Sequence, residues 1–266
     1  MSDEKNLRTS WGAVAQWYDQ LLGKEDTFQA NVILPNLMRL LDVKRGESIL
    51  DLACGQGYFS YALASCGAKV TGTDISPELI ALAKRQMPTV GRKEGEPPQK
   101  MQVQFAVAPA NQQTPVVTAS MDRALIVLAI QNIEDVKGAF WEAHRALKPD
   151  GTLHLVLNHP AFRVPKGSSW EWDKDGTQYR RVDKYLVEST AKIQMKPGDD
   201  PGLTTVSFHR PLQFFVKTLV NSGFVITNLE EWTSHKTSDS GPRAAEENRA
   251  RNEIPLFLYI EARRTR

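Results

Sequence analysis

The chain has 266 residues, of which 41% are hydrophobic and 24% are charged, and its formal net charge is +2. That length suits one large α/β domain or two small ones. The near balance of charge argues against a protein that binds nucleic acid or a membrane surface through a basic face.

Short apolar runs and a low number of cysteines exclude further classes of protein. The longest apolar run, residues 124–130, is much shorter than a membrane span and is typical of a buried strand. The first residues are polar and lack the pattern of a signal peptide. Cys54 and Cys66 are too few for a disulfide framework and form no spaced cluster of the kind that binds metal. We therefore expect a protein of the reducing cytoplasm, without a membrane span or a bound metal.

Apolar residues have helical spacing in the N-terminal segment, and strands alternate with helices after it. Apolar residues recur at helical intervals between 11 and 22 and between 33 and 41, which predicts an N-terminal helical cap over residues 1–45. From residue 48 onward strands and helices alternate. Strands are expected at 48–53, 69–75, 103–108, 122–130 and 152–158, and helices at 58–66, 77–87 and 135–147.

The alternation breaks after residue 160. Residues 161–210 are polar, aromatic and irregular, and they predict an insertion over the carboxyl edge of the sheet, where ligands bind in such folds. A helix at 212–222 and strands at 224–232 and 256–263 follow, with a charged loop at 234–253. Seven strands with interleaved helices predict an α/β fold with a Rossmann-like doubly wound sheet. Its cofactor-binding core would be 46–160, and 211–266 would supply the last helix and two strands.

A glycine turn follows the first expected strand, where residues 49–59 read ILDLACGQGYF. Gly55 and Gly57 allow a tight turn and a close approach of the backbone to a ligand. The next helix begins at once and presents free N–H groups. Asp74 ends the second strand, where a carboxylate can accept hydrogen bonds from both hydroxyls of a ribose. The strand, the turn, the helix and the acid together predict a nucleoside-binding site.

Two residues indicate which nucleoside derivative is bound. Ser60 stands where a dinucleotide fold usually has its third glycine. Asp51 would repel a pyrophosphate but suits a cationic amino-acid group, and the chain lacks a P-loop. The ligand should carry an adenosine and a positive charge but no phosphate, which fits S-adenosyl-L-methionine. An NAD-type oxidoreductase is the disfavoured alternative.

On these residues the sequence resembles the class I S-adenosylmethionine-dependent methyltransferases, in particular the type 11 group. The resemblance covers most of residues 11–158 and returns at 206–263. It implies that Asp74 holds the ribose, that Ile75 packs on the adenine and that Tyr18 covers the cofactor. The residues implied to bind S-adenosylmethionine are Tyr18, Asp51, Ala53, Gly55, Gly57, Asp74, Ile75, Ala110 and Leu128.

One position departs from the family pattern. Pro109 stands where the family often has an aspartate that contacts the adenine amino group. Either Asn111 or Gln112 is a possible substitute, and the backbone N–H of Ala110 remains available to the adenine ring.

Two histidines are candidates for a general base on the acceptor side. His159 follows the fifth expected strand at the ligand-binding edge, and His209 precedes the helix at 212. A base is needed only if the acceptor loses a proton as it attacks, and otherwise catalysis rests on positioning. For each histidine the alternative is a structural role.

A small molecule methylated on oxygen or nitrogen is the favoured acceptor. After the fourth expected strand the chain reads AIQN at 129–132, without the prolines of enzymes that methylate base amino groups, and neither cysteine lies near that loop. No basic stripe points to nucleic acid. A non-catalytic relative that acts through a partner protein is the second alternative. The sequence leaves the acceptor's identity and the oligomeric state open.

Overall fold

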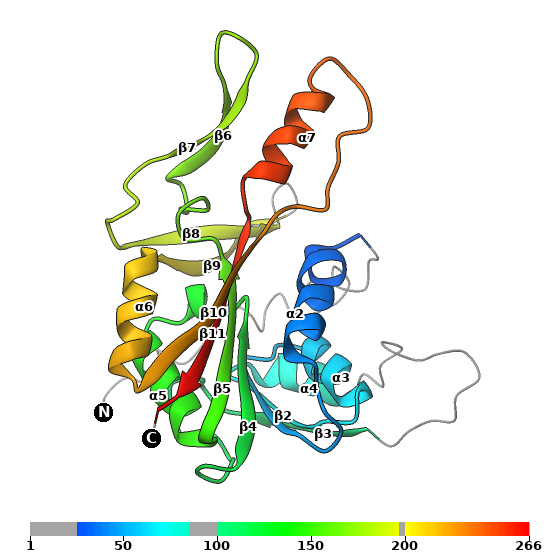
Figure 1. The fold of residues 1–266 in the computed structure, drawn as a ribbon, viewed down its shortest axis with the longest axis vertical. Helices are drawn as coiled ribbons and strands as arrows, with labels where there is room; N and C mark the ends of the chain where they lie inside the picture. Colours follow the sequence, from blue (N-terminus) through cyan, green and yellow to red (C-terminus); the bar gives the residue numbers. More distant parts are fainter. Residues whose placement is uncertain (1–25, 86–100, 197–199, 266) are drawn as a thin grey trace, which may run out of the picture.

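The computed structural model describes residues 26–85, 101–196 and 200–265 (Figure 1). The expectations for residues 1–25, Tyr18 among them, and for the loop at 88–100 lie outside these ranges. The described chain begins with the short π-helix η2 (Gln29–Ile33) and continues directly as α2 (Leu34–Leu41). Leu37 and Leu41 are fully buried, so the helical spacing read between residues 33 and 41 is confirmed.

A seven-stranded sheet forms the centre of the molecule, and its strand order is β10-β11-β5-β4-β1-β2-β3. Strands β1 to β5 are parallel, whereas β11 runs antiparallel to both β5 and β10. The predicted Rossmann-like sheet is confirmed. Its strands are β1 Ser48–Leu52, β2 Lys69–Asp74, β3 Gln102–Val107, β4 Met121–Val127, β5 Leu147–Asn158, β10 Phe224–Trp232 and β11 Phe257–Arg264.

Helices cover both faces of this sheet (Figure 1). In the central strands, successive side chains pack alternately into two core clusters. Leu50 joins a cluster that contains Phe140 of α5, whereas Ile49 joins a cluster that contains Leu63 of α3. This two-sided burial explains the unbroken apolar run of β4. The covering helices are α3 Tyr58–Ser65, α4 Pro77–Arg85, α5 Val136–Ala146 and α6 Leu212–Asn221.

The segment after β5 is more regular than its sequence suggested. Residues 161–210 were expected to be irregular but contain two antiparallel hairpins. In β9 the buried residues include Thr205, Ser207 and His209. A strand is usually recognised by buried apolar residues that alternate with exposed polar ones, and because the buried residues here are polar, this signal is missing from the sequence. The hairpin strands are β6 Ser168–Trp172, β7 Gln178–Val182, β8 Ser189–Lys196 and β9 Asp200–His209.

The charged loop expected at 234–253 is also partly wrong, because α7 (Ala244–Glu253) lies within it. Of the α7 residues only Ala250 is buried, so no apolar stripe marks the helix. Charge pairs support it instead: Arg249 binds Glu246 and Glu253, and Arg251 binds Glu247. A helix that is polar all round depends on such pairs along its surface.

The two hairpins lie in different places. Asn132, in the 3₁₀-helix η3 (Ile130–Asn132) after β4, donates its side-chain N–H to the carbonyl of Val206 in β9 at 2.7 Å. The β8–β9 hairpin therefore covers the carboxyl edge of the sheet. The β6–β7 hairpin extends beyond it beside α7, where Glu246 accepts the N–H of Gln178 at 2.9 Å (Figure 1). No helix within the described ranges is long and apolar enough to cross a membrane.

Candidate active site

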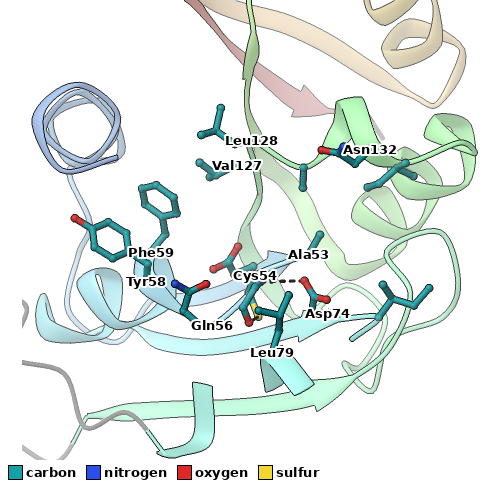
Figure 2. A pocket seen from close by; sticks show the side chains of 15 residues that line it. Ala53, Cys54, Gln56, Tyr58, Phe59, Asp74, Leu79, Val127, Leu128 and Asn132 are labelled. Carbon is teal, nitrogen blue, oxygen red and sulfur yellow. Dashed lines mark hydrogen bonds between the residues drawn. The ribbon is translucent and has the colours of Figure 1, made fainter. Parts of the chain in front are cut away.

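A pocket opens at the carboxyl ends of β1, β2 and β4 (Figure 2), and its empty space, counted together with open solvent at its mouth, is about 810 Å³. The residues that line it are Asp51, Ala53, Cys54, Gly55, Gln56, Tyr58, Phe59, Asp74, Ile75, Leu79, Val127, Leu128, Ala129, Asn132 and Ile133.

The glycine turn lies at the pocket, where Gly55 is part of the lining and Gly57 is not. Gly55 and Gly57 both have positive φ, +58° and +83°, and Gly57 is the N-cap of α3. A Cβ atom at Gly57 would lie 2.6 Å from the Phe105 ring, so both the conformation and the space require glycine. Two other pocket residues, Ala53 and Leu128, have φ of +57° and +53°. Non-glycine residues adopt this conformation rarely, and they do so often at functional sites.

Asp51 is a buried carboxylate on the pocket wall. Ser60 in α3 donates its hydroxyl to Asp51 Oδ2 at 2.5 Å. Burial, opposed by this hydrogen bond and reinforced by the nearby Asp74, raises the pKa of Asp51 to about 7. Ser60 had been read only as a missing glycine, and its place one helical turn after the glycine turn was the signal for this contact. An acid held in this way gains most from a cationic ligand.

Asp74 ends β2 and is oriented by the backbone on both sides. Its Oδ2 accepts the N–H of Gly55 at 3.0 Å (Figure 2), and its Oδ1 accepts the N–H of Ser76 at 2.9 Å. Burial raises the pKa of Asp74, against the lowering effect of these amides. Each oxygen of an ionised carboxylate has a second lone pair, so the oriented group can still accept hydrogen bonds from a ligand.

Most of the residues expected to bind the cofactor meet in this pocket, namely Asp51, Ala53, Gly55, Asp74, Ile75 and Leu128. Ala110 does not line it and packs in the core cluster with Phe140. Nor do Asn111 and Gln112 line it, and Asn111 instead contacts Asp135 at 3.4 Å. Sequence reasoning missed the apolar side of the pocket, because residues such as Phe59 and Leu79 look like ordinary helix core.

His159 lies outside the pocket lining, and both of its ring nitrogens are engaged. Nδ1 accepts the N–H of Ala161 at 3.2 Å, which leaves Nε2 to donate to Glu231 at 2.6 Å. Burial lowers the pKa of His159, against the effect of Glu231. The ring is therefore neutral and has no free lone pair, and a general base needs one.

His209 lines a second cavity beside η3, whose empty space, counted together with open solvent at its mouth, is about 310 Å³. Its Nε2 donates to the carbonyl of Tyr185 at 2.8 Å. In the neutral form of the ring this bond leaves the lone pair on Nδ1, for which the described residues provide no hydrogen-bond partner. The cavity is lined by Gln131, Leu157, Asn158, Pro160, Arg163, Pro165, Ser207, Phe208, His209, Arg210 and Phe215.

Comparison with known proteins agrees with this geometry. Residues 50–155 match the family model of a methyltransferase domain, Methyltransf_11. A demethylmenaquinone methyltransferase of Chlorobaculum parvum is 31% identical over 157 residues, which are 57% of this chain and 59% of that protein. An uncharacterized protein of Haemophilus influenzae is 25% identical over 93% of this chain and 92% of its own length. The crystal structure of an S-adenosylmethionine-dependent methyltransferase from Mesorhizobium loti has a TM-score of 0.66 and 28% identity, covering 86% of this chain and 96% of that one.

The fold, the pocket and these matches point to one class. Residues 50–155 match a methyltransferase domain, and the chain is similar to class I S-adenosylmethionine-dependent methyltransferases of the type 11-like group, whose cofactor is S-adenosylmethionine. The chain spans about 60% of the length of the first curated relatives that it matches. The segments that would contact an acceptor therefore cannot be carried over from them.

Proposed function

We propose that this protein transfers a methyl group from S-adenosylmethionine to an oxygen or nitrogen atom of a small molecule. The observation that carries the proposal is the pair of buried carboxylates, Asp51 and Asp74, in one pocket. Neither forms an ion pair with a described residue. Two neighbouring buried acids without a cation favour a ligand that brings its own positive charge.

The pocket residues fit S-adenosylmethionine in chemistry as well as charge. Asp51 would bind the ammonium group of the methionyl part, and Asp74 would accept the ribose hydroxyls. Ile75 and Leu79 supply apolar surface for the adenine. When bound, the cofactor supplies a sulfonium methyl group that is open to displacement by a lone pair.

The second cavity is the better place for the acceptor. The segment 128–133 contributes Leu128, Ala129, Asn132 and Ile133 to the first cavity and Gln131 to the second. His209 lines the second cavity, and in the neutral form of its ring Nδ1 carries the free lone pair that a base for an acceptor hydroxyl or ammonium group requires. His159 lacks that free nitrogen. We therefore rank His209 above His159 as the base, and we assign His159 to holding the chain after β5.

Direct titration with S-adenosylhomocysteine, the demethylated product, tests the proposal. We expect micromolar affinity by titration calorimetry, and no binding up to millimolar ligand would overturn it. Asp74→Asn should weaken binding by about 1.5–3 kcal/mol, because a charge-assisted contact becomes neutral. Asp173→Asn, in the exposed turn after β6, is the matched control and should bind as the wild type does. Product formation with a screened acceptor then separates an enzyme from a relative that only binds the cofactor.

A further inference from the structure

Among the described residues, two cationic side chains and no acidic ones line the second cavity. Arg163 and Arg210 lie on its wall, together with His209, the amides of Gln131 and Asn158 and several apolar side chains. A concave site with one sign of charge concentrates ligands of the opposite sign.

Arg163 is the cation whose hydrogen-bonding capacity is least used. Its Nη1 donates to Asn158 Oδ1 at 2.6 Å, and its guanidinium lies 5.5 Å from the centre of the Phe257 ring. Within the described ranges it has no other hydrogen bond and no carboxylate within ion-pair distance. Burial and the neighbouring Arg180 lower the pKa of Arg163 to about 10, so it remains charged at neutral pH.

Arg210, the other arginine that lines the cavity, has a structural role. Arg210 donates to the carbonyls of Ile133 and Glu134 at 3.0 and 2.6 Å. Its guanidinium also lies 5.0 and 5.2 Å from the ring centres of Phe208 and Phe214. Arg210 is therefore a fixed part of the wall that adds positive charge, whereas Arg163 presents unused N–H groups. Arg163 is only partly buried, so solvent still reaches its unused N–H groups, and an oxyanion in the cavity would replace that solvent with charge-assisted hydrogen bonds.

Gln131 supplies a second unsatisfied group on the same wall. Its Nε2 donates to the carbonyl of Leu128 at 2.6 Å, while its Oε1 is buried without a hydrogen-bond partner. An unpaired buried acceptor is costly unless a ligand donates to it. The cavity thus offers a cation for an oxyanion and an oxygen for a donor.

We propose that the acceptor is a small molecule with an oxyanionic group, a carboxylate or a phosphate, that Arg163 binds in this cavity. This inference rests on the proposed methyltransferase function and specifies its substrate class. A guanidinium matches either oxyanion through two parallel N–H···O bonds. An acceptor anchored there would extend along the segment 128–133, which contributes to both cavities, to bring its reacting atom to the cofactor pocket, and Gln131 would accept a hydrogen bond from it.

Binding of simple probes to the full chain saturated with S-adenosylhomocysteine tests this inference. The probes are benzoate, its neutral isostere benzamide, and inorganic phosphate, each measured by calorimetry and by the shift in Tm. We expect benzoate or phosphate to bind at least tenfold more tightly than benzamide, and the preferred anion identifies the source of the oxyanion. Equal binding of benzoate and benzamide without phosphate binding, or no binding of any probe, would overturn the inference.

Variants locate the effect at one residue. Arg163→Gln should weaken the preferred anion at least tenfold while leaving the affinity for S-adenosylhomocysteine unchanged. Arg163→Lys, which keeps the charge but loses the paired geometry, should weaken it less. The matched control is Arg181→Gln, an exposed arginine of β7 that pairs with Glu171 and should leave anion binding unchanged. Anion binding that survives Arg163→Gln contradicts the inference.

Two experimental failures, an unfolded variant and the absence of S-adenosylhomocysteine binding, can be distinguished from failure of the inference. If Arg163→Gln does not fold, as judged by circular dichroism, Arg163→Lys and the wild-type comparison of benzoate with benzamide decide the matter. If S-adenosylhomocysteine itself does not bind, the proposed function fails, and the same probes are measured on the free protein. Preference for the anion would then support an oxyanion site independent of methyl transfer, and its absence would overturn the site as well.

Discussion

A buried carboxylate that titrates near neutrality gives the cofactor pocket a pH dependence. In the folded protein the pKa of Asp51 is about 7, against an ordinary value of 3.8. Its contribution to stability is therefore complete below pH 4 and is lost as the pH rises to about 7. A cationic ligand binds the ionised form, so ligand affinity changes in the opposite direction over the same range.

The first prediction concerns these opposite pH dependences of protein stability and ligand affinity. Between pH 5 and 7 the affinity for S-adenosylhomocysteine should rise by up to about tenfold per pH unit, and above pH 7 it should level off. Asp51→Asn should bind more weakly and remove most of the slope, while raising the Tm of the free protein at pH 8. Calorimetry and thermal unfolding across this range measure both effects.

Ser60 offers a finer test of the same group. Ser60→Ala removes the hydroxyl that stabilises the Asp51 carboxylate, so the midpoint of the affinity profile should move to higher pH. Ser65→Ala is the matched control, because Ser65 lies in the same helix and donates only to the carbonyl of Ala62. An unmoved midpoint in Ser60→Ala would mean that Asp51 does not control the pH dependence.

The second prediction separates the two histidines. With an acceptor found by screening, His209→Asn should lower kcat by roughly a hundredfold or more with unchanged cofactor affinity, because a base is lost. His159→Asn should lower the Tm through its contacts with Ala161 and Glu231, and its kcat should stay within about threefold of the wild type. The opposite pattern would restore His159 as the base.

Sequence reasoning placed residues correctly where their position follows from their own strand and turn. Asp51, Gly55 and Asp74 were placed at one pocket in this way, and their roles toward the cofactor stay predictions. His159 was preferred over His209 for the same reason, since it follows a strand at the correct edge. Its partner Glu231 is 72 positions away, and no local pattern announces that contact.

At the level of elements, the cover over the pocket depends on a few polar contacts. Arg210 follows β9 and fixes it to the chain after β4 through the carbonyls of Ile133 and Glu134. Asn132 adds the contact with Val206. These bonds hold the β8–β9 hairpin beside both cavities. The local stability of the β8–β9 hairpin should therefore fall when a single one of these hydrogen bonds is removed.

The third prediction is that Arg210→Lys destabilises the protein by about 1–3 kcal/mol, because an ammonium group cannot satisfy both carbonyls or lie flat between two aromatic rings. Hydrogen exchange of the amides in residues 204–209 should accelerate with it. Arg181→Lys, on the projecting hairpin, is the control and should change neither quantity. Unchanged exchange in Arg210→Lys would show that apolar packing alone holds the cover.

The elements that the sequence did not predict share a physical cause. In β9 the inward side chains are small and polar, and α7 is stabilised by charge pairs rather than by an apolar face. Apolar periodicity, the signal that identified β4 and α5, is absent from both. Their structure depends on contacts with distant segments, such as that between Gln178 and Glu246.

At the scale of the whole molecule, one sheet joins the cofactor pocket to the acceptor side. Strands β1, β2 and β4 end at the first cavity, and β5 ends at the second. The doubly wound sheet was predicted from the alternation of elements, whereas the order of its strands was not. The chemistry of the acceptor was not, because it depends on where the 161–210 segment folds back across that edge.

The fourth prediction is that the folded molecule as a whole responds to one nucleoside ligand and not to another. A ligand that binds only the native state at a hundred times its Kd stabilises it by about 2.7 kcal/mol. For a chain of this size S-adenosylhomocysteine should therefore raise the Tm by roughly 5–10 °C. NAD should have no effect, because Asp51 repels a pyrophosphate and Ser60 occupies the place of the third glycine. Asp51→Asn should reduce the shift by S-adenosylhomocysteine, whereas Ser65→Ala should retain it. Stabilisation by NAD instead would return the pocket to the dinucleotide-binding class, since the fold alone is compatible with either ligand.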